Sequence, residues 1–404
     1  MAGANAPFDP AAATAAYLAQ LPPAAHARAA AYTHGDHWIL LWSALVAVAI
    51  SLLVLRTGLL VRLRRRISSS RRRVWLAVLV VVAVDLALET LLALPWNAYQ
   101  DWWRDRSYGL TSQAFAGWLG EALLMGLISV LALTLLMAGI YALIRRAPRS
   151  WWLWSAGVTG LFVVLLLVVS PVFIQPLFNT YKPAPPGPVR DAVVRMAQAH
   201  GVPSDKVVVF NGSKQSNRYT ANVSGAFGTA RVAMSDVMFA KGADQAEVRG
   251  VVGHEMGHYA HRHTLINAAV YSLLALVVFF LVDKLFAPVL ALTGAEGVEG
   301  LADPAGFPVI GIILTVLALL GTPLTAAITR LEESDADRFS LQAANEPDGL
   351  AKALVKTIEY RAATPSKLEE FLFYDHPAVG RRIRRCMDWK AAHPPAPPPP
   401  QGAI

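Results

Sequence analysis

The sequence predicts a mainly α-helical, polytopic membrane protein with about six spans and a small β-sheet. Of the 404 residues, 55% are hydrophobic and only 16% are charged, whereas a soluble domain is usually about a quarter charged. Six apolar stretches reach the roughly 20 helical residues that cross a bilayer. Two short runs, 206–210 and 230–234, have the composition of strands.

The first half of the chain is expected to consist of an N-terminal segment followed by four spans. Residues 1–36 lack the charged start and apolar run of a secretory signal, and they predict a short, mostly helical extramembrane segment. Residues 37–174 predict four transmembrane helices, at 37–60, 74–96, 116–144 and 151–174.

Arginines flank these spans and indicate a topology. Seven of the twelve positions from Arg62 to Arg73 are Arg, and further arginines lie in 145–149. Because they occupy short loops between apolar runs, they are typical of a membrane boundary, and nucleic acid is not expected as a partner. The positive-inside rule assigns both loops to the cytoplasm, so the segment after the fourth span is expected to be extracytoplasmic.

Several ionisable residues interrupt the spans, and they have two interpretations. Such groups are unfavourable in lipid, so they either pair across helices or face a hydrated chamber. They are Asp85, Glu89, Glu121, Asp283 and Lys284.

The second half alternates extramembrane and membrane segments. Residues 175–264 predict a Pro-rich connector at 182–188, a helix at 189–200, the two strands and a helix at 243–263. Residues 265–328 predict a transmembrane hairpin, with spans at 265–292 and 307–328. Residues 329–390 predict a polar helical segment, and the Pro-rich tail 391–404 is expected to be disordered. The single cysteine, Cys386, excludes an internal disulfide and a cysteine-based zinc site.

The helix at 243–263 carries the most informative motif, His254-Glu255-Met256-Gly257-His258. Histidines four residues apart lie on one helix face, so both imidazoles can reach one metal ion. Glu255 then lies beside the ion as a general base for zinc-activated water. The alternative is a helix whose histidines bind no metal. The nearby His261 and His263 favour this alternative slightly, because they show that the local sequence is rich in histidine.

A third ligand is expected in the segment after the hairpin. The alternative in which the third ligand is a histidine at position 264 is excluded, because that residue is Thr264. Glu333 is the candidate, since Asp337 follows four residues later and could hold a ligand histidine, as in gluzincins. Glu332 and Asp335 compete with it, and a solvated acidic helix start remains the alternative. A hairpin of two spans returns the chain to its starting face, so the long sequence gap permits a short distance.

With these residues the chain resembles the Ste24 family of CAAX prenyl endopeptidases, intramembrane zinc proteases of the M48 type. The resemblance covers about 9–389 and rests on the two helices above and on three further elements: 176–179, 220–225 and Asp375-His376-Pro377. It implies one Zn²⁺ per chain and a gluzincin-like peptidase region. It also implies an edge strand at 216–225 whose Asn222 holds the substrate backbone, and a His376 that stabilises the oxyanion.

The chain departs from the family in two ways. Val223 follows Asn222 where the family has Ala and then Tyr, which leaves the side-chain preference of the groove open. Six spans are expected where eukaryotic members have seven, with the first one missing. The relatives are described with a zinc site reached from the cytosol, whereas the arginines of this chain favour an extracytoplasmic catalytic face.

The leading hypothesis is therefore an integral-membrane zinc metalloendopeptidase in a bacterial inner (plasma) membrane. Its expected partners are the lipid bilayer and a peptide or protein substrate, with prenylated and membrane-associated substrates among the candidates. One alternative is quality-control cleavage of membrane proteins, as in HtpX-like proteases. A different class is a non-enzymatic metal-binding transporter, in which Glu255 has no role.

Overall fold

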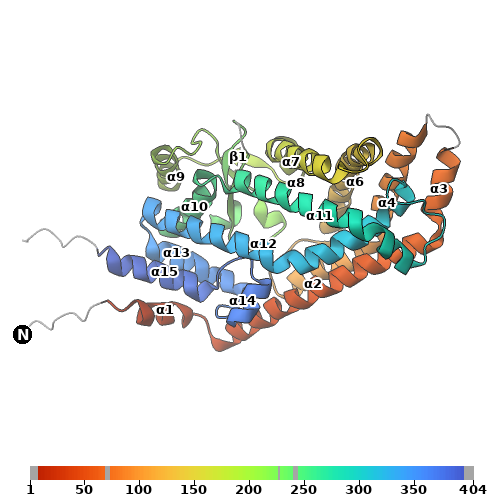
Figure 1. Cartoon of the computed structure of the whole chain (residues 1–404). Helices are drawn as coiled ribbons and strands as arrows, with labels where there is room; N and C mark the ends of the chain where they lie inside the picture. The colour runs from red at the N-terminus through yellow and green to blue at the C-terminus, as the bar shows by residue number, and fades with distance from the viewer. Residues whose placement is uncertain (1–7, 69–72, 226–227, 240–243, 395–404) are drawn as a thin grey trace, which may run out of the picture.

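The computed structural model describes residues 8–68, 73–225, 228–239 and 244–394. Within these residues, six helices are long and apolar enough to cross a membrane, which confirms the predicted number of spans. Their cores are α2 (Pro23–Thr57), α4 (Val74–Asn97), α6 (Phe115–Arg146), α7 (Trp151–Val169), α11 (His263–Thr293) and α12 (Phe307–Ala344). They form an elongated bundle along which α2 and α12 run for most of its length (Figure 1).

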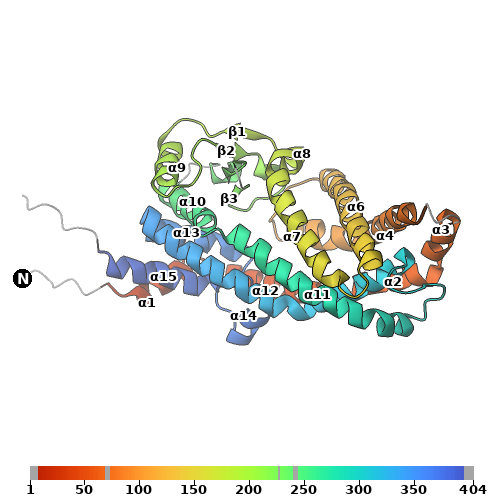
Figure 2. The same cartoon turned by 45° about the horizontal axis from the view of Figure 1, so that its top comes forward.

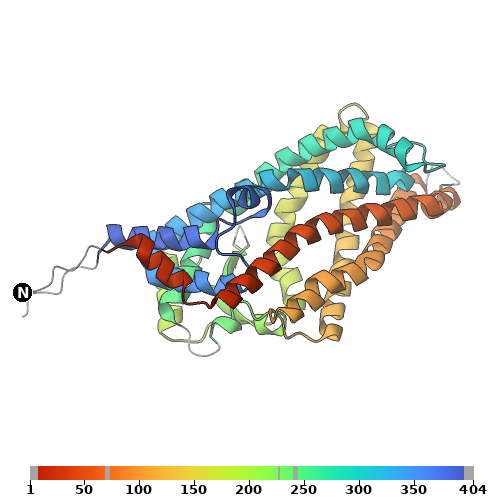
Figure 3. The same cartoon turned by 90° about the horizontal axis from the view of Figure 1, so that it is seen from below.

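The bundle has a shared apolar core. Leu55, Val82, Ile140, Val282 and Ile310 belong to one buried cluster and come from five different helices. Figure 3 shows α2 running from the end near α1 (Pro10–Leu18) to the end near α3 (Leu59–Ile67). The bundle therefore joins the end of the molecule near α1 to the end near α3.

The arginine-rich end is more helical than expected. Residues 62–66 of the predicted loop lie on α3, and Arg64 pairs with the buried Asp303 at 2.7 Å. Positions 69–72 of that loop lie outside the described residues. Both predicted arginine loops lie at this end, because α6 ends there at Arg146.

Most ionisable groups within the spans have polar partners in the protein. The pairs are Glu121 with Lys214 (2.6 Å), Glu89 with Ser51 (2.9 Å) and Asp283 with Trp151 (2.8 Å). Asp85 is fully buried, and neither of its oxygens has a hydrogen-bond partner among the described residues. Pairing between spans therefore accounts for Glu89 and Asp283, whereas Glu121 pairs with Lys214 of the segment after the fourth span.

A four-stranded sheet forms the opposite end, in the order β1-β2-β4-β3. The strands are β1 (Tyr181–Pro183), β2 (Val207–Phe210), β3 (Ala221–Ser224) and β4 (Arg231–Ser235). β2 and β4 pair in parallel, and the other two pairs are antiparallel. Val232 and Met234 of the central strand pack with Val193 of α9 (Pro188–Ala199) and Val252 of α10 (Gln245–Ala260). Figure 2 shows this sheet and its helices at one end and α3 at the other.

Two predictions about the sheet need correction. β1 (Tyr181–Pro183) overlaps the start of the Pro-rich connector predicted at 182–188. The edge strand predicted at 216–225 is only four residues long, because the preceding segment bonds elsewhere. The Asn217 N–H donates to the Leu110 carbonyl at 2.9 Å, and the Thr111 hydroxyl donates to the Gln215 carbonyl at 2.6 Å.

Two helix boundaries also differ from the prediction. The helix predicted at 243–263 ends at Ala260 because Arg262 adopts a left-handed conformation (φ 57°) and α11 begins at His263; Ala243 lies outside the described residues. The sixth span does not end near Ile328 but continues as one helix to Ala344. No proline or glycine follows Ile328 in this helix to interrupt it.

Short helices complete the sheet end. They are α5 (Arg104–Ser107), α8 (Gln175–Phe178), α13 (Pro347–Lys356), α14 (Lys367–Phe373) and α15 (Val379–Ala392). Ala351, Leu354, Ile383 and Met387 form a buried cluster against which Tyr17 of α1 packs. Residues 395–404 of the predicted tail lie outside the described part.

Candidate metal centre

Helix α10 presents the motif from a buried position. Asp244 caps its N-terminus by accepting from the Ala246 N–H at 2.9 Å. Val248, Val252 and Met256 are fully buried against the sheet. His254 and His258 are four residues, or about one turn, apart and therefore share one face of this helix. That face is different from the one that packs against the sheet.

Helix α12 approaches α10 closely because small residues separate them. A Cβ added at Gly257 would lie 2.9 Å from Ala336 Cα, and one at Gly253 would lie 3.1 Å from Ser340 Oγ. The Ser340 hydroxyl donates to the Gly250 carbonyl at 2.6 Å and ties the helices together. This packing brings the next turn of α12 against the histidines.

Three side chains from the two helices converge on one point. His254 Nε2 lies 3.2 Å from Glu333 Oε2, and His258 Nε2 lies 3.3 Å from Glu333 Oε1. The two Nε2 atoms are 3.3 Å apart. One donor atom from each residue falls in a set whose members all lie within 4.8 Å of one another.

This donor set fits a tetrahedral metal ion. Donor atoms about 3.3 Å apart are what bonds of about 2.05 Å give in a tetrahedron. Glu333 is 5% exposed, and its Oε2 faces His254 Nε2 at 3.2 Å and the Arg382 guanidinium at 3.6 Å. A buried carboxylate that faces two imidazoles is a suitable ligand for a cation. Sequence reasoning singled out these three residues, and the fold brings them together.

Asp337 holds the other side of the His254 ring. Its Oδ1 lies 3.0 Å from His254 Nδ1, so a proton on Nδ1 leaves the Nε2 lone pair free for a metal. Arg382 donates to both Asp337 oxygens, at 2.7 and 2.9 Å, and Arg385 donates to Oδ2 at 3.0 Å. The two arginines were not predicted. The basic run of α15 was the only signal, and it does not reveal which residues point inward.

The pKa of His254 is raised above its ordinary value. Burial by itself lowers the pKa of His254, but hydrogen bonds to Asp337 and Glu333 raise it to about 9. The pKa of Glu255 is raised above its ordinary value by desolvation, against the opposing effect of His254 and His258. A carboxylate with a raised pKa is suited to accept and return a proton near neutral pH.

His376 lies at the same centre although it comes from the segment between α14 and α15. Its Nε2 is 3.3 Å from Glu333 Oε1, and its Nδ1 is 2.7 Å from Asp375 Oδ1. Burial lowers the pKa of His376, and the hydrogen bond to Asp375 opposes that effect. An imidazole here can donate to an oxygen close to the metal position.

Asn222 is less directly connected to the centre. It lies on β3, at the edge of the sheet, opposite Ala233 of β4. Thr220 and Ala221, not Asn222, line the cavity beside the histidines. The Asn222 Oδ1 is buried and has no partner among the described residues. The edge strand is therefore present, but its asparagine is not brought into that cavity.

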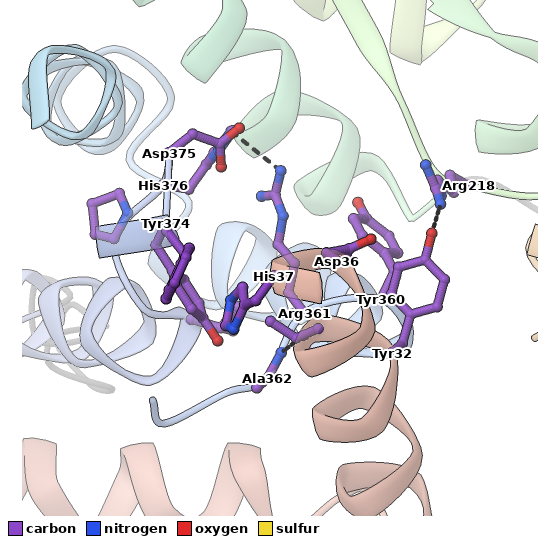
Figure 4. Close-up of a pocket in the computed structure, with 14 residues that line it drawn as sticks. Tyr32, Asp36, His37, Arg218, Tyr360, Arg361, Ala362, Tyr374, Asp375 and His376 are labelled. Carbon is purple, nitrogen blue, oxygen red and sulfur yellow. Dashed lines mark hydrogen bonds and ion pairs between the residues drawn. The ribbon is translucent and has the colours of Figure 1, made fainter. Parts of the chain in front are cut away.

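Two cavities meet at His376. A cavity of about 180 Å³ contains His254, Glu255 and Glu333, with an apolar wall that includes Leu350. A second cavity of about 330 Å³ shares Tyr360, Arg361 and His376 with the first. Figure 4 shows Arg361 facing Asp375 and His376 there, while Arg218 meets Tyr32 on the opposite wall.

Comparisons with known proteins agree with this architecture. A profile of "Peptidase family M48" matches residues 183–390, and one of "CAAX prenyl protease N-terminal, five membrane helices" matches 11–180. In the described part of 11–180, four helices qualify as spans, one fewer than that description.

Individual relatives extend over most of the chain. The uncharacterised metalloprotease YhfN of Bacillus subtilis is 30% identical and aligns with 74% of this chain and 70% of its own length. The CAAX prenyl protease 1 of Saccharomyces cerevisiae is 26% identical over 74% and 69%. The crystal structure of S. mikatae Ste24p has the same fold, with a TM-score of 0.74 and 19% identity over 94% and 95% of the two chains.

Proposed function

The chain belongs to peptidase family M48 and is a membrane metalloprotease, and we propose that its metal is zinc, one ion per chain, held by His254, His258 and Glu333. The observation that carries this assignment is that the two imidazole Nε2 atoms lie 3.3 Å apart and each lies 3.2 to 3.3 Å from one oxygen of the Glu333 carboxylate on the other helix. Two imidazoles and one carboxylate, with a fourth position left open, are a typical ligand set of a catalytic zinc.

Glu255 is proposed as the proton carrier of the reaction. A bound zinc would lower the pKa of a coordinated water and polarise the substrate carbonyl. The Glu255 carboxylate accepts a proton from the attacking water and later gives it to the leaving amine nitrogen. His376, beside Glu333, donates to the oxygen that becomes negatively charged. Asp337 fixes the His254 tautomer.

The substrate is proposed to bind as an additional strand along β3. In the described part of the chain β3 pairs only with β4, so its other edge offers backbone donors and acceptors. Asn222 would support the substrate backbone from that strand. This mode recognises backbone more than sequence, so both unmodified and prenylated peptides are candidate substrates.

A Glu255→Gln variant tests the proposal. Gln keeps the shape of the side chain but cannot take the proton, so zinc content stays at one per chain and hydrolysis falls by about 100-fold or more. The measurement is peptide cleavage by the purified protein, with a farnesylated and an unmodified form of the same peptide. Undiminished hydrolysis by the variant contradicts the assignment. Faster cleavage of the farnesylated form supports a prenyl-protein substrate, and equal rates support quality-control cleavage.

The catalytic end is proposed to face outward from a bacterial inner (plasma) membrane. Arginines of α3 and α6 gather at the end of the bundle opposite the metal centre, which favours a cytoplasmic location for that end. With an impermeant maleimide on intact cells, Lys352→Cys should be labelled and Arg149→Cys should not. The native Cys386 is 1% exposed and gives little background. The reverse labelling pattern would place the catalytic end in the cytoplasm.

A further inference from the structure

His263, the first residue of the membrane helix α11, touches the metal site from outside. Its Nδ1 lies 3.0 Å from His258 Nδ1. The two rings meet edge to face, with centroids 5.1 Å apart and an interplanar angle of 72°. His263 is only 5% exposed. The contact therefore lies on the opposite side of the His258 ring from Glu333.

We propose that His263 is a positioning residue for the metal ligand His258, acting as the acceptor for its Nδ1–H. This inference rests on the proposed function, because it assumes that His258 Nε2 binds a metal. A metal on Nε2 requires the proton of the neutral ring to be on Nδ1, where it needs an acceptor. His263 supplies the acceptor only with a bare Nδ1 and its own proton on Nε2.

The two ligand histidines are then held by different chemistry. Asp337 accepts from His254, as a carboxylate commonly does in zinc sites. A second carboxylate behind His258 would add another negative charge close to Glu333. A neutral imidazole fixes the tautomer and the ring orientation without that charge.

The backbone between the two helices is arranged to make this contact. On an uninterrupted helix, residues five apart point about 140° away from each other. His258 and His263 are five apart and yet meet, because Arg262 between them is left-handed (φ 57°). A non-glycine residue adopts this conformation only at a free-energy cost. The turn thus brings the start of a membrane span onto a metal ligand.

The test compares near-isosteric variants of the full-length protein in detergent. Asn places its Oδ1 where His263 has Nδ1, whereas Leu has a similar size and no acceptor. His263→Leu should weaken zinc binding by about 10- to 100-fold in a chelator competition, and His263→Asn should restore most of the affinity. The visible spectrum of the Co²⁺-loaded protein should change with Leu and not with Asn. His261→Leu is the control, because the exposed His261 makes no hydrogen bond to His258 in the described structure and should bind zinc normally.

Different failures of this experiment have different meanings. Should the Leu variant not fold, His263→Gln serves instead, since its amide lies one carbon further out and should also weaken binding. Wild-type affinity in the Leu or Gln variant overturns the role of His263, as does equal weakening by Leu and Asn. A wild-type chain that binds no zinc overturns the proposed function itself.

Discussion

At the residue scale, the candidate centre depends on a shell of charges around one carboxylate. Asp337 is 1% exposed and accepts from Arg382 and Arg385 while it faces His254. A buried carboxylate in this setting is stable because it is fully paired. Its position decides the orientation of the His254 ring and thereby of the donor atom Nε2.

Asp337→Asn should therefore weaken the metal site. The amide keeps one acceptor oxygen but loses the charge that balances Arg382, and its NH₂ group can turn toward His254. We expect zinc affinity to fall by about 10- to 100-fold, measured by chelator competition. Asp335→Asn is the matched control, since Asp335 pairs with Arg338 at the surface. Equal zinc affinity in the wild-type and Asp337→Asn proteins would show that Asp337 does not orient His254.

At the element scale, the centre exists because α10 and α12 touch along a row of small residues. Gly257 faces Ala336, one helical turn beyond Glu332 and Glu333. Larger residues here would separate the two histidines from the carboxylate that completes the donor set. The distance between helix axes is therefore as important as the identity of the ligands.

Gly257→Ala tests this dependence on close packing. The new Cβ would lie 2.9 Å from Ala336 Cα and 3.1 Å from Phe339 Cβ, so α12 must shift. We expect a loss of about 1–3 kcal/mol in stability and weaker zinc binding, measured by thermal unfolding and chelator competition. Gly321→Ala on α12 is the control, because nothing lies within 4 Å of its added Cβ. A Gly257→Ala protein with wild-type zinc affinity would contradict the argument.

Sequence reasoning identified elements better than it identified their ends and their distant contacts. Apolar length predicted the spans, and two local pairs, His254 with His258 and Glu333 with Asp337, predicted the candidate centre. The continuation of α12 past Ile328 was missed, since polarity changes there while helix propensity does not. Contacts such as that of Arg382 with Asp337 depend on tertiary packing and leave no local pattern.

At the scale of the whole molecule, hydrogen bonds connect the sheet end to the membrane bundle. Arg218, just before β3, donates to Asp105 and to the Tyr32 hydroxyl at 3.0 to 3.1 Å. Asp105 lies on α5, at the end of the second candidate span, and Tyr32 lies on α2. The hairpin of α11 and α12 leaves and returns beside α10. The centre is thus assembled from parts that only the folded membrane protein brings together.

The most direct test of the central claim follows hydrolysis as zinc is removed and returned. The full-length protein is stripped with a chelator, and peptide cleavage is measured against zinc bound per chain. Activity should vanish with the metal, rise in proportion to occupancy and level off at one zinc per chain, because one set of three donors holds one ion. Cleavage that persists in the metal-free protein, or that requires a second zinc, would contradict the account.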